Sequence, residues 1–381
     1  MDNIIYWIWL SLAASPGSTL TRKLCEFFDA DIRAIYEADA SLYRQVKLTA
    51  KNIAALSDKS LDNAENIINW CNAKHVKILT YGDKAYPEKL RAITNCPPVL
   101  YYIGELYDID NLLTVASVGT RKMTKYGHDT AYSFCYDLAK SGAVVVSGLA
   151  AGIDTVCHRA ALDAGGKTIA VIGTRIDKVY PAENREIMRE IARKCLLITE
   201  FHPFSKTQPM NFPKRNRIVS ALSDATVVFE ADTKSGSLIT ADLARKQNRK
   251  VYSIPGKIGE TGSLGTNELI QDGAVLVTRA SDILNEYKDK YPLKCSSERL
   301  FDYSPASQIK DSFGKKQKEN IIPITDPLQK QIYGMLSVDT PISPEELSLN
   351  GISYSDTVTA LTMLETYGYV RLHPGNLYTK K

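Results

Sequence analysis

The chain has 381 residues, which is enough for two or three domains that each bury a hydrophobic core. Its hydrophobic content of 44% and charged content of 24% are typical of a soluble globular protein. The net charge of only +4 excludes a uniformly basic surface, so any site for a polyanion must be a local patch. The seven cysteines lie far apart and form no CxxC pair, which argues against a zinc site or a disulfide framework and favours a reducing cytoplasm.

Residues 1–78 are predicted to form a small domain of short helices. Its first apolar run, Ile4–Leu12, is too short to cross a bilayer and lacks the positive flank of a signal peptide. This run is therefore predicted to be a core helix, and no membrane contact is expected. The turn Pro16–Thr19 leaves two interpretations open: a helix-hairpin-helix that contacts DNA backbone, or a helical bundle that packs against or recruits another protein.

Residues 79–287 show a regular alternation of apolar strands and helices, after short β-rich pieces at 77–104. Continuous apolar strands separated by helices indicate a parallel sheet covered on both faces. The sequence therefore predicts an α/β fold, a Rossmann-like doubly wound and mostly parallel sheet, with ligands beyond the carboxyl ends of its strands. The predicted strands are Leu113–Val118, Ala143–Ser147, Thr168–Ile172, Leu196–Thr199, Ala225–Phe229, Lys250–Ile254 and Ala274–Val277; the predicted helices include Asp154–Ala164, Ala182–Lys194, Arg215–Leu222 and Leu238–Gln247.

The C-terminal part of the chain is predicted to be a linker, 288–325, followed by a winged-helix domain, 326–381. The linker lacks periodicity and is rich in Ser, Pro and Lys. Three amphipathic helices and a strand pair that turns at 374–376 are typical of a winged helix. Its third helix, Ser355–Tyr367, contains no Lys or Arg, which favours protein–protein contact over reading of the DNA major groove.

The first loop with unusual composition follows the strand that ends at Val118. Gly119 permits close approach of a ligand, Thr120 offers a hydroxyl, and Arg121 can bridge two phosphate oxygens. Lys122 adds a further positive charge. The alternative is an ordinary strand-to-helix turn with a surface arginine, but the position at the ligand edge of the sheet favours anion binding.

The second loop, Ser147–Asp154, holds two glycines at the start of a helix. Ser147 and Gly148 are candidates for phosphate contact, although the loop is not the GxGxxG dinucleotide fingerprint. Asp154 is interpreted as a helix cap and His158 as a structural histidine. Because no Ser–His–Asp or Cys–His set is apparent, we predict no catalytic residue, no metal site and no cofactor.

The stretch Asn211–Leu243 carries the third and fourth candidate loops. No acidic residue falls between Glu200 and Asp224, so we expect nothing nearby to neutralise its cations. The turn at 235–237 precedes a helix and directs free amides toward an anion. Interleaved aromatic residues suit a single-stranded polynucleotide better than a lone nucleotide. The candidate residues of these two loops are Phe212, Lys214, Arg215, Asn216, Arg217, Ser235, Gly236 and Ser237.

Several motifs in order resemble the DprA/Smf family of bacterial DNA-processing proteins. They are SVGTRK (117–122), VSGLAAGID with His158 (146–158), VIGTRIDKVYPAEN (171–184), ITE (198–200), FPKRNRIVSALSD (212–224), SGSLITADLA (235–244) and IPG (254–256). One departure is Ala151, where many relatives carry Arg.

The resemblance implies a non-catalytic, cytoplasmic protein that binds single-stranded DNA, usually as a homodimer. It also implies a recombination mediator that protects incoming single strands and loads RecA on them during natural transformation. By motif, Arg121 and Lys214 are the expected phosphate contacts and Phe212 a base-stacking partner. The other residues named in the four loops are expected to line the same pocket.

Two alternative functions remain open. An enzyme that cleaves N-glycosidic bonds of nucleotides would use Glu268, because Pro255-Gly256 and Gly265–Glu268 loosely echo a phosphoribohydrolase motif. A nucleotide-sensing module that signals through the tail domain is the other. These alternatives predict, respectively, release of free base and saturable binding of mononucleotides.

Overall fold

The computed structural model describes residues 3–293 and, from 324 onward, the C-terminal residues except 325, 339, 350, 367, 368, 374 and 381. The described residues fall into two compact units, which divide between residues 302 and 303. Each unit is described by itself. Most of the predicted linker, 288–325, lies outside the described residues.

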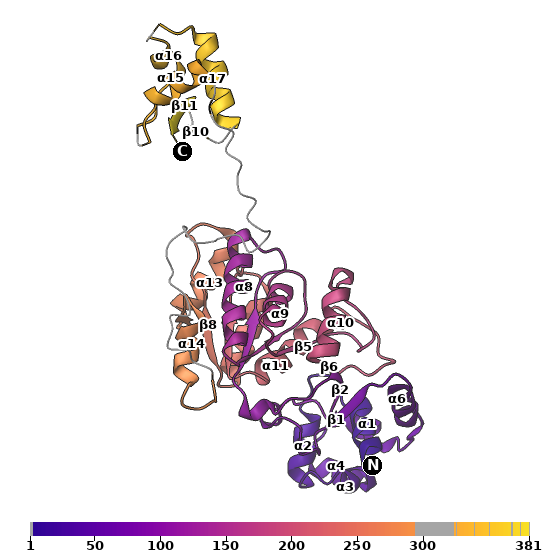
Figure 1. The fold of residues 1–381 in the computed structure, drawn as a ribbon. Coiled ribbons are helices and arrows are strands. Elements are labelled where there is room, and N and C mark those ends of the chain that lie inside the picture. Colours follow the sequence, from indigo (N-terminus) through magenta and orange to yellow (C-terminus); the bar gives the residue numbers. More distant parts are fainter. Residues whose placement is uncertain are drawn as a thin grey trace. The chain divides into compact units, whose positions relative to one another are not determined.

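The larger unit begins with short helices that gather next to strands β1 and β2 (Figure 1). The first helix, α1, buries Trp7, Ile8, Trp9 and Leu10, which confirms that the apolar N-terminal run is a core helix. No helix among the described residues is long and apolar enough to cross a membrane. The helices are α1 (Ile4–Ala13), α2 (Leu20–Phe27), α3 (Ile32–Glu37), α4 (Ala40–Gln45), α5 (Ala50–Ser57) and α6 (Asp62–Ala73).

A nine-stranded sheet forms the centre of the larger unit, in the order β1-β2-β6-β5-β4-β3-β7-β8-β9. The strands from β6 to β9 in this order run parallel, whereas β2 pairs antiparallel with both β1 and β6. This confirms the predicted Rossmann-like, mostly parallel sheet. The strands are β1 (Lys77–Thr80), β2 (Val99–Gly104), β3 (Thr114–Val118), β4 (Val144–Ser147), β5 (Thr168–Val171), β6 (Leu196–Thr199), β7 (Ala225–Val228), β8 (Lys250–Ser253) and β9 (Val275–Leu276).

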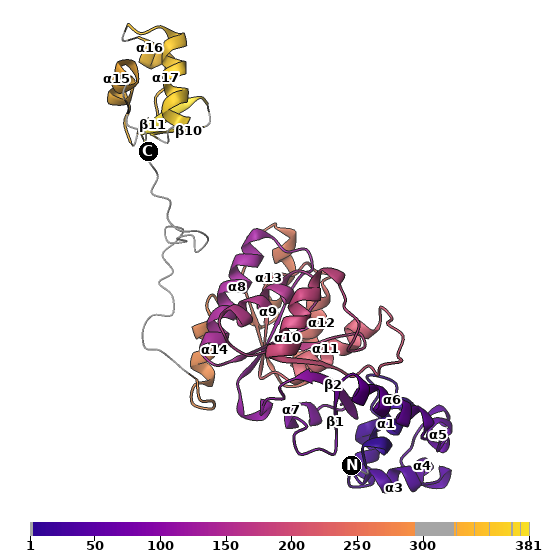
Figure 2. The same cartoon turned by 45° about the vertical axis from the view of Figure 1, so that its right-hand side comes forward.

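Helices cover both faces of this sheet because its strands are apolar on both sides. Val115, Val145 and Val227 share a core with α8, α9 and α14, whereas the next residue of each strand belongs to the core shared with α11 and α12. Figure 2 shows α11 and α12 side by side. The helices are α7 (Glu88–Arg91), η1 (Ile109–Asn111), α8 (Lys125–Lys140), α9 (Ile153–Asp163), η2 (Ala182–Asn184), α10 (Arg185–Lys194), α11 (Asn211–Ala221), α12 (Gly236–Lys246), α13 (Thr261–Gln271) and α14 (Ala280–Tyr287).

The strand order reverses between β3 and β7. From β3 the chain winds outward through β4, β5 and β6, then returns to β7 on the other side of β3 and winds outward through β8 and β9. Loops that leave two neighbouring strands in opposite directions open a crevice at their carboxyl ends, which is where ligands of such sheets bind. The topology therefore points to the loops after β3 and β7.

The C-terminal unit contains three helices and a hairpin around a small core. Ile332, Leu347, Leu361 and Leu364 are fully buried there. This order of elements is the one on which the winged-helix prediction rests. The elements are α15 (Pro327–Met335), α16 (Pro344–Ser348), α17 (Tyr354–Thr366), β10 (Val370–His373) and β11 (Leu377–Lys380), and the two strands pair antiparallel.

Candidate anion-binding site

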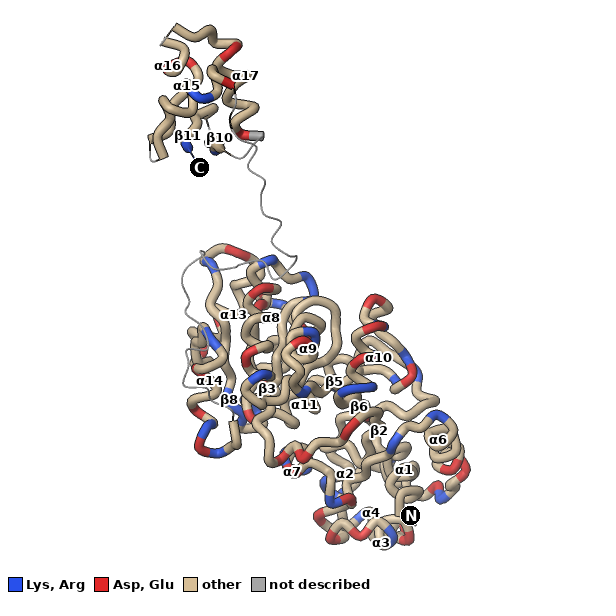
Figure 3. The backbone as a smooth tube through the Cα atoms, viewed as in Figure 1, with Lys and Arg blue, Asp and Glu red and all other residues tan. Residues whose placement is uncertain are grey.

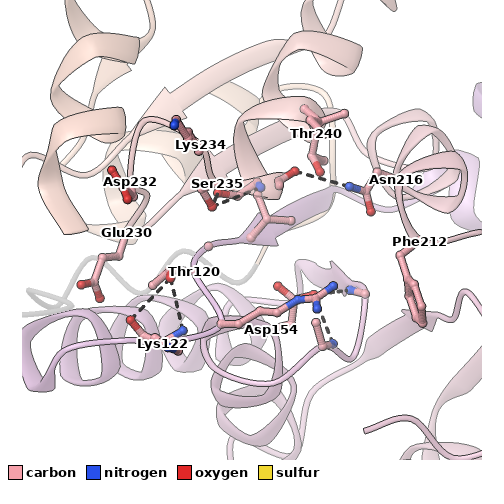
Figure 4. Close-up of a pocket in the computed structure, with 18 of the residues that line it drawn as sticks. Thr120, Lys122, Asp154, Phe212, Asn216, Glu230, Asp232, Lys234, Ser235 and Thr240 are labelled. Atoms are coloured by element: carbon pink, nitrogen blue, oxygen red, sulfur yellow. Dashed lines mark hydrogen bonds between the residues drawn. The ribbon is translucent and has the colours of Figure 1, made fainter. Parts of the chain in front are cut away.

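A pocket of about 650 Å³ lies at the carboxyl ends of β3, β4 and β7, where the strand order reverses. Its walls come from the loop after β3, the loop between β4 and α9, the start of α11 and the turn between β7 and α12. Figure 4 shows Phe212 and Asn216 at one end of the pocket, Glu230 and Asp232 at the other, and Thr120 and Ser235 between them. Segments that are distant in sequence therefore converge at one edge of the sheet.

The FPKRNR segment is part of a helix, not of a loop. The predicted helix began at Arg215, but α11 begins at Asn211 and includes the proline. Pro213 is the third helical residue, and an amide at this position has no partner within the helix, so its loss costs nothing. The helical spacing separates the predicted cations, because side chains only two residues apart point in different directions.

Arg215 is the buried cation of the pocket wall. Its side chain is 4% exposed, and Nη1 donates a hydrogen bond to the carbonyl oxygen of Val171. Burial lowers the pKa of Arg215 to about 10, while the opposite charge of Asp154 acts against this shift. The guanidinium lies against Gly148, where any Cβ would come within 1.8 Å of Nη1. Nε of Arg215 has no hydrogen-bond partner among the described residues.

Arg217 does not line the pocket, which corrects the expectation of uncompensated cations. Its Nη2 lies 2.5 Å from Oε2 of Glu200, and the two side chains are only 3% and 4% exposed. Burial raises the pKa of Glu200, and the positive charge of Arg217 opposes that shift. The acid that neutralises Arg217 ends the ITE motif after β6, outside the acid-free stretch of sequence.

Asp154 is not a helix cap, because Gly152 holds the N-cap position of α9. Instead, Oδ2 of Asp154 accepts hydrogen bonds from the backbone N–H groups of Gly148 and Ala150, at 3.1 and 3.4 Å. Burial raises the pKa of Asp154, and Arg215 opposes this shift. The carboxylate thus shapes the second loop and partly balances the buried arginine.

The turn before α12 lines the pocket, but it offers fewer free amides than expected, because the N–H of Ser235 donates to the carbonyl oxygen of Asp232 at 2.9 Å. Ser235 is the N-cap, and its Oγ accepts a hydrogen bond from the N–H of Ser237 at 3.4 Å. Asn216 Nδ2 contacts the carbonyl oxygen of Gly236 at 3.5 Å and ties α11 to this turn. The first amides of an eleven-residue helix, at the positive end of its dipole, favour a bound anion.

Arg121 and Phe212 meet at the aromatic end of the pocket. The Arg121 guanidinium carbon lies 5.9 Å from the centre of the Phe212 ring. Lys214 follows on the same helix, but it is exposed and its side chain lies near Gly17 instead of in the pocket. Arg121 therefore lines the pocket beside Phe212, whereas Lys214, two residues further along α11, does not.

The structure brings most of the predicted residues together. Ser147 is an exception, because its buried Oγ donates to the carbonyl oxygen of Ser117 at 2.6 Å. Lys214 and Arg217 are the other two exceptions. The predicted residues that line the pocket are Gly119, Thr120, Arg121, Lys122, Gly148, Phe212, Arg215, Asn216, Ser235, Gly236 and Ser237.

The sequence reasoning missed an acidic end of the pocket. Glu230, which is 4% exposed, accepts a hydrogen bond from the backbone N–H of Thr124 at 3.0 Å. Asp232 accepts from the N–H of Thr233 at 2.7 Å. Glu230 is the second residue after β7, and its place after a strand next to the switch point was the signal that would have marked it. Lys234 and Thr240 are further lining residues that were not predicted.

Metal-ligating side chains do not cluster in the part of the chain that the structure describes. No group of three or more metal-ligating side chains occurs there. His158 is fully buried, its Nδ1 lies 2.7 Å from Oγ1 of Thr168, and burial lowers its pKa to about 3, as expected of a structural histidine. Glu268, the acid of the N-glycosidase alternative, is exposed on α13 and does not line the pocket.

Comparison with known proteins agrees with this fold and site. A sequence model of the family described as DNA recombination-mediator protein A matches residues 77–288. The chain is 30% identical over 396 residues to protein Smf of Synechocystis sp., and the alignment covers 99% of this chain and 98% of that protein. It is 42% identical over 206 residues to the DNA processing protein DprA of Streptococcus pneumoniae, covering 54% of this chain and 72% of that protein.

Two solved structures resemble the chain. The X-ray structure of DprA from Streptococcus pneumoniae superposes with a TM-score of 0.65 at 32% identity, covering 75% of this chain and 99% of that one. DNA processing protein A from Helicobacter pylori, whose structure is described as revealing a unique single-stranded DNA binding mode, gives a TM-score of 0.51 at 33% identity, covering 57% and 97%.

The fold and the pocket define a Rossmann-like protein with a pocket lined by cations at the switch point of its sheet. The chain belongs to the DprA/Smf family of DNA recombination mediators. This is a family of DNA-processing proteins and not a known family of enzymes.

Proposed function

We propose that this protein binds single-stranded DNA without cleaving it, protects incoming strands, and loads RecA on them during natural transformation. The observation that carries the proposal is the convergence of Arg121, the buried Arg215 and the N-terminus of α12 at 235–237 on one pocket. Phosphate groups bind best where cations and free helix amides meet. The structure of a relative described as binding single-stranded DNA supports the same reading.

The aromatic end of the pocket supports a polynucleotide over a mononucleotide. Phe212 lies beside Arg121, and an aromatic ring next to a cation is the arrangement on which bases of a single strand stack. Lys214 is exposed on the same helix and is proposed to contact a phosphate outside the pocket. Arg217 is not proposed as a contact, because Glu200 already neutralises it.

The larger unit also offers a surface for a second copy of the chain. Its edge strand β9 is only two residues long, and both Val275 and Leu276 are exposed, at 38% and 49%. A strand this short offers little backbone pairing, but its exposed apolar side chains favour contact with another chain. We propose that the protein is a cytoplasmic homodimer that uses this edge.

The C-terminal unit is proposed to be a winged helix that contacts protein. Its α17 contains acidic residues but no Lys or Arg among residues 354–366.

Figure 3 shows that positive and negative residues are interspersed along the larger unit, so its binding site is a local patch. Recruitment of RecA requires protein surfaces outside that patch.

A gel-shift series tests the proposed function. We expect the protein to shift single-stranded DNA at lower concentrations than double-stranded DNA, and to add a slower complex when RecA is present. The double variant Arg121→Ala, Lys214→Ala should lose the shift while keeping the thermal unfolding profile of the wild type, since both residues are exposed. Equal binding by this variant would contradict the proposal. Release of free base from mononucleotides would favour the N-glycosidase alternative, and tighter binding of a mononucleotide than of the oligonucleotide would favour the nucleotide-sensing alternative.

A further inference from the structure

The two ends of the pocket differ in what they offer a strand that leaves it. Glu230 and Asp232 lie at one end, together with Lys122 and Lys234, and Phe212 lies at the other (Figure 4). The two carboxylates offset the positive charge of the two lysines there. Phe212 is the one aromatic side chain among the described residues that line the pocket, so the end formed by Phe212 offers a base a ring on which to stack. This aromatic end is therefore the favourable path for a single strand.

A second aromatic ring lies next along this path. Tyr180, from the segment between β5 and η2, has its ring centre 4.9 Å from that of Phe212, with an angle of 37° between the planes. Tyr180 is 47% exposed, so part of its surface is free to contact a ligand. The rings place a cation and two aromatic groups in series, in the order Arg121, Phe212, Tyr180.

The segment that carries Tyr180 is held in place by hydrogen bonds. Thr174 Oγ1 donates to the carbonyl oxygen of Lys178 at 2.8 Å, and Thr199 Oγ1 donates to the carbonyl oxygen of Thr174 at 2.8 Å. The Phe212 ring packs on Gly173, where a Cβ would come within 2.8 Å of Cδ1. The Phe212 ring and the segment that carries Tyr180 are therefore positioned before any ligand arrives, which lowers the entropy cost of stacking.

We propose that Tyr180 is a second stacking platform, on which a base rests as the single strand leaves the pocket past Phe212. This inference rests on the proposed function, because it takes the ligand of the pocket to be a single strand. It adds to that function a direction for the strand and a second nucleotide contact, formed by a residue outside the pocket wall. Stacking is tolerant of sequence because every base has a π-face, so the platform fits any single strand.

The test compares Tyr180→Ala, Tyr180→Phe and Tyr126→Ala by fluorescence anisotropy. The probes are a labelled oligothymidylate about twenty nucleotides long and, as competitor, thymidine monophosphate. Tyr126 is a matched control, because it is exposed to 51% and stands at the start of α8, close to the acidic end, where Glu230 lies against Gly127. Both side chains are exposed in part, so the three variants should fold as the wild type does.

We expect Tyr180→Ala to bind the oligothymidylate about tenfold more weakly, which is the loss of one stacked base. Tyr180→Phe should retain wild-type affinity, because the ring and not the hydroxyl makes the contact. Tyr126→Ala should also retain it. Competition by thymidine monophosphate should be unchanged in Tyr180→Ala, since a mononucleotide reaches only the pocket; weaker competition would mean that Phe212 had been displaced and would overturn the proposal.

Failure of the proposal and failure of the proposed function give different results. If the wild type binds the oligothymidylate and Tyr180→Ala binds it equally well, the proposed stacking role of Tyr180 is wrong. The proposed binding of single-stranded DNA at the pocket is then unaffected. A loss in Tyr180→Phe as large as in Tyr180→Ala would also overturn a stacking role. If the wild type does not bind the oligothymidylate at all, the proposed function itself fails.

Discussion

Buried charges lie at both ends of the parallel strands: at the amino-terminal ends, called the amino edge, and at the carboxyl-terminal ends, called the carboxyl edge. The two edges differ in how completely their charges are paired. At the amino edge, Asp224 accepts hydrogen bonds from Lys89 Nζ at 2.6 Å, from Tyr291 OH at 2.5 Å and from the backbone N–H of Thr114 at 3.1 Å. At the carboxyl edge, Arg215 is equally buried, but its Nε has no partner among the described residues and its side chain borders an open pocket. A saturated charge network holds a fold together, whereas a buried cation with spare donors beside a pocket is suited to an anionic ligand.

The pKa values at the two edges follow this difference. Burial by itself would raise the pKa of Asp224, but the hydrogen bonds from Lys89 and Tyr291 outweigh it and lower the pKa. For Arg215, burial is the dominant effect and lowers the pKa to about 10, since Asp154 compensates it only in part. A bound phosphate would supply the further negative charge that Arg215 needs as a partner.

The largest expected effect is on stability at the amino edge. Asp224→Ala leaves Lys89 buried without its counter-charge, so we expect a loss of about 3–5 kcal/mol in the free energy of unfolding. Urea denaturation measures this. Asp242→Ala is the control, because Asp242 is 58% exposed, pairs with Lys246 on one helix face and should cost at most about 1 kcal/mol. A loss for Asp224→Ala no larger than for the control would contradict a structural role for the amino edge.

A smaller effect is expected on ligand affinity at the carboxyl edge. Gly148→Ala introduces a Cβ at a position 1.8 Å from Nη1 of Arg215 and so pushes the guanidinium out of place. We expect about a tenfold loss of affinity for single-stranded DNA, the value of one charge-assisted hydrogen bond. Gly334→Ala, with no atom within 4 Å of the new Cβ, should bind as the wild type does. Equal affinity of both variants in an anisotropy titration would show that Arg215 takes no part in binding.

A further effect depends on pH and concerns a buried carboxyl away from both edges. Burial raises the pKa of Asp137 on α8 to about 7, and Lys140 opposes this shift. Between about pH 4 and pH 7 the folded protein keeps a proton that the unfolded chain has lost, so stability falls as the pH rises through this window, by at most about 1.4 kcal/mol per pH unit. Asp137→Asn should therefore be more stable than the wild type at about pH 8 and equally stable at about pH 4. Urea denaturation measures the free energy of unfolding of both proteins at each pH. If the two values change with pH in parallel, Asp137 does not have the raised pKa.

Most strands of the parallel sheet could be predicted from sequence because they are continuous apolar runs between helical stretches, a pattern typical of a sheet covered on both faces. The start of α11 could not, because Pro213 usually marks a boundary and here occupies the first helical turn, where it is tolerated. The order of the strands could not be predicted either, since it depends on how the crossovers pack.

The site was predictable where the loop itself carries the chemistry and unpredictable where the fold supplies a partner. Arg121 and Ser235 line the pocket as their motifs suggested. Arg217 belongs to the same motif as Arg215, yet Glu200, seventeen positions earlier, meets it only after β6 and α11 pack. Glu230 likewise reaches the pocket only because β7 packs next to β3 in the sheet. Charge counted along a sequence therefore overstates the charge that is free in space.

The most direct test of the central claim is the salt dependence of affinity for single-stranded DNA, measured for the wild type and Arg121→Ala. We predict that affinity falls steeply with salt, and that the slope of log K against log salt becomes shallower by about 0.7 in the variant, the value of one lost phosphate contact. An affinity that does not respond to salt, or a variant whose slope equals that of the wild type, would contradict the claim that this pocket binds a sugar-phosphate chain.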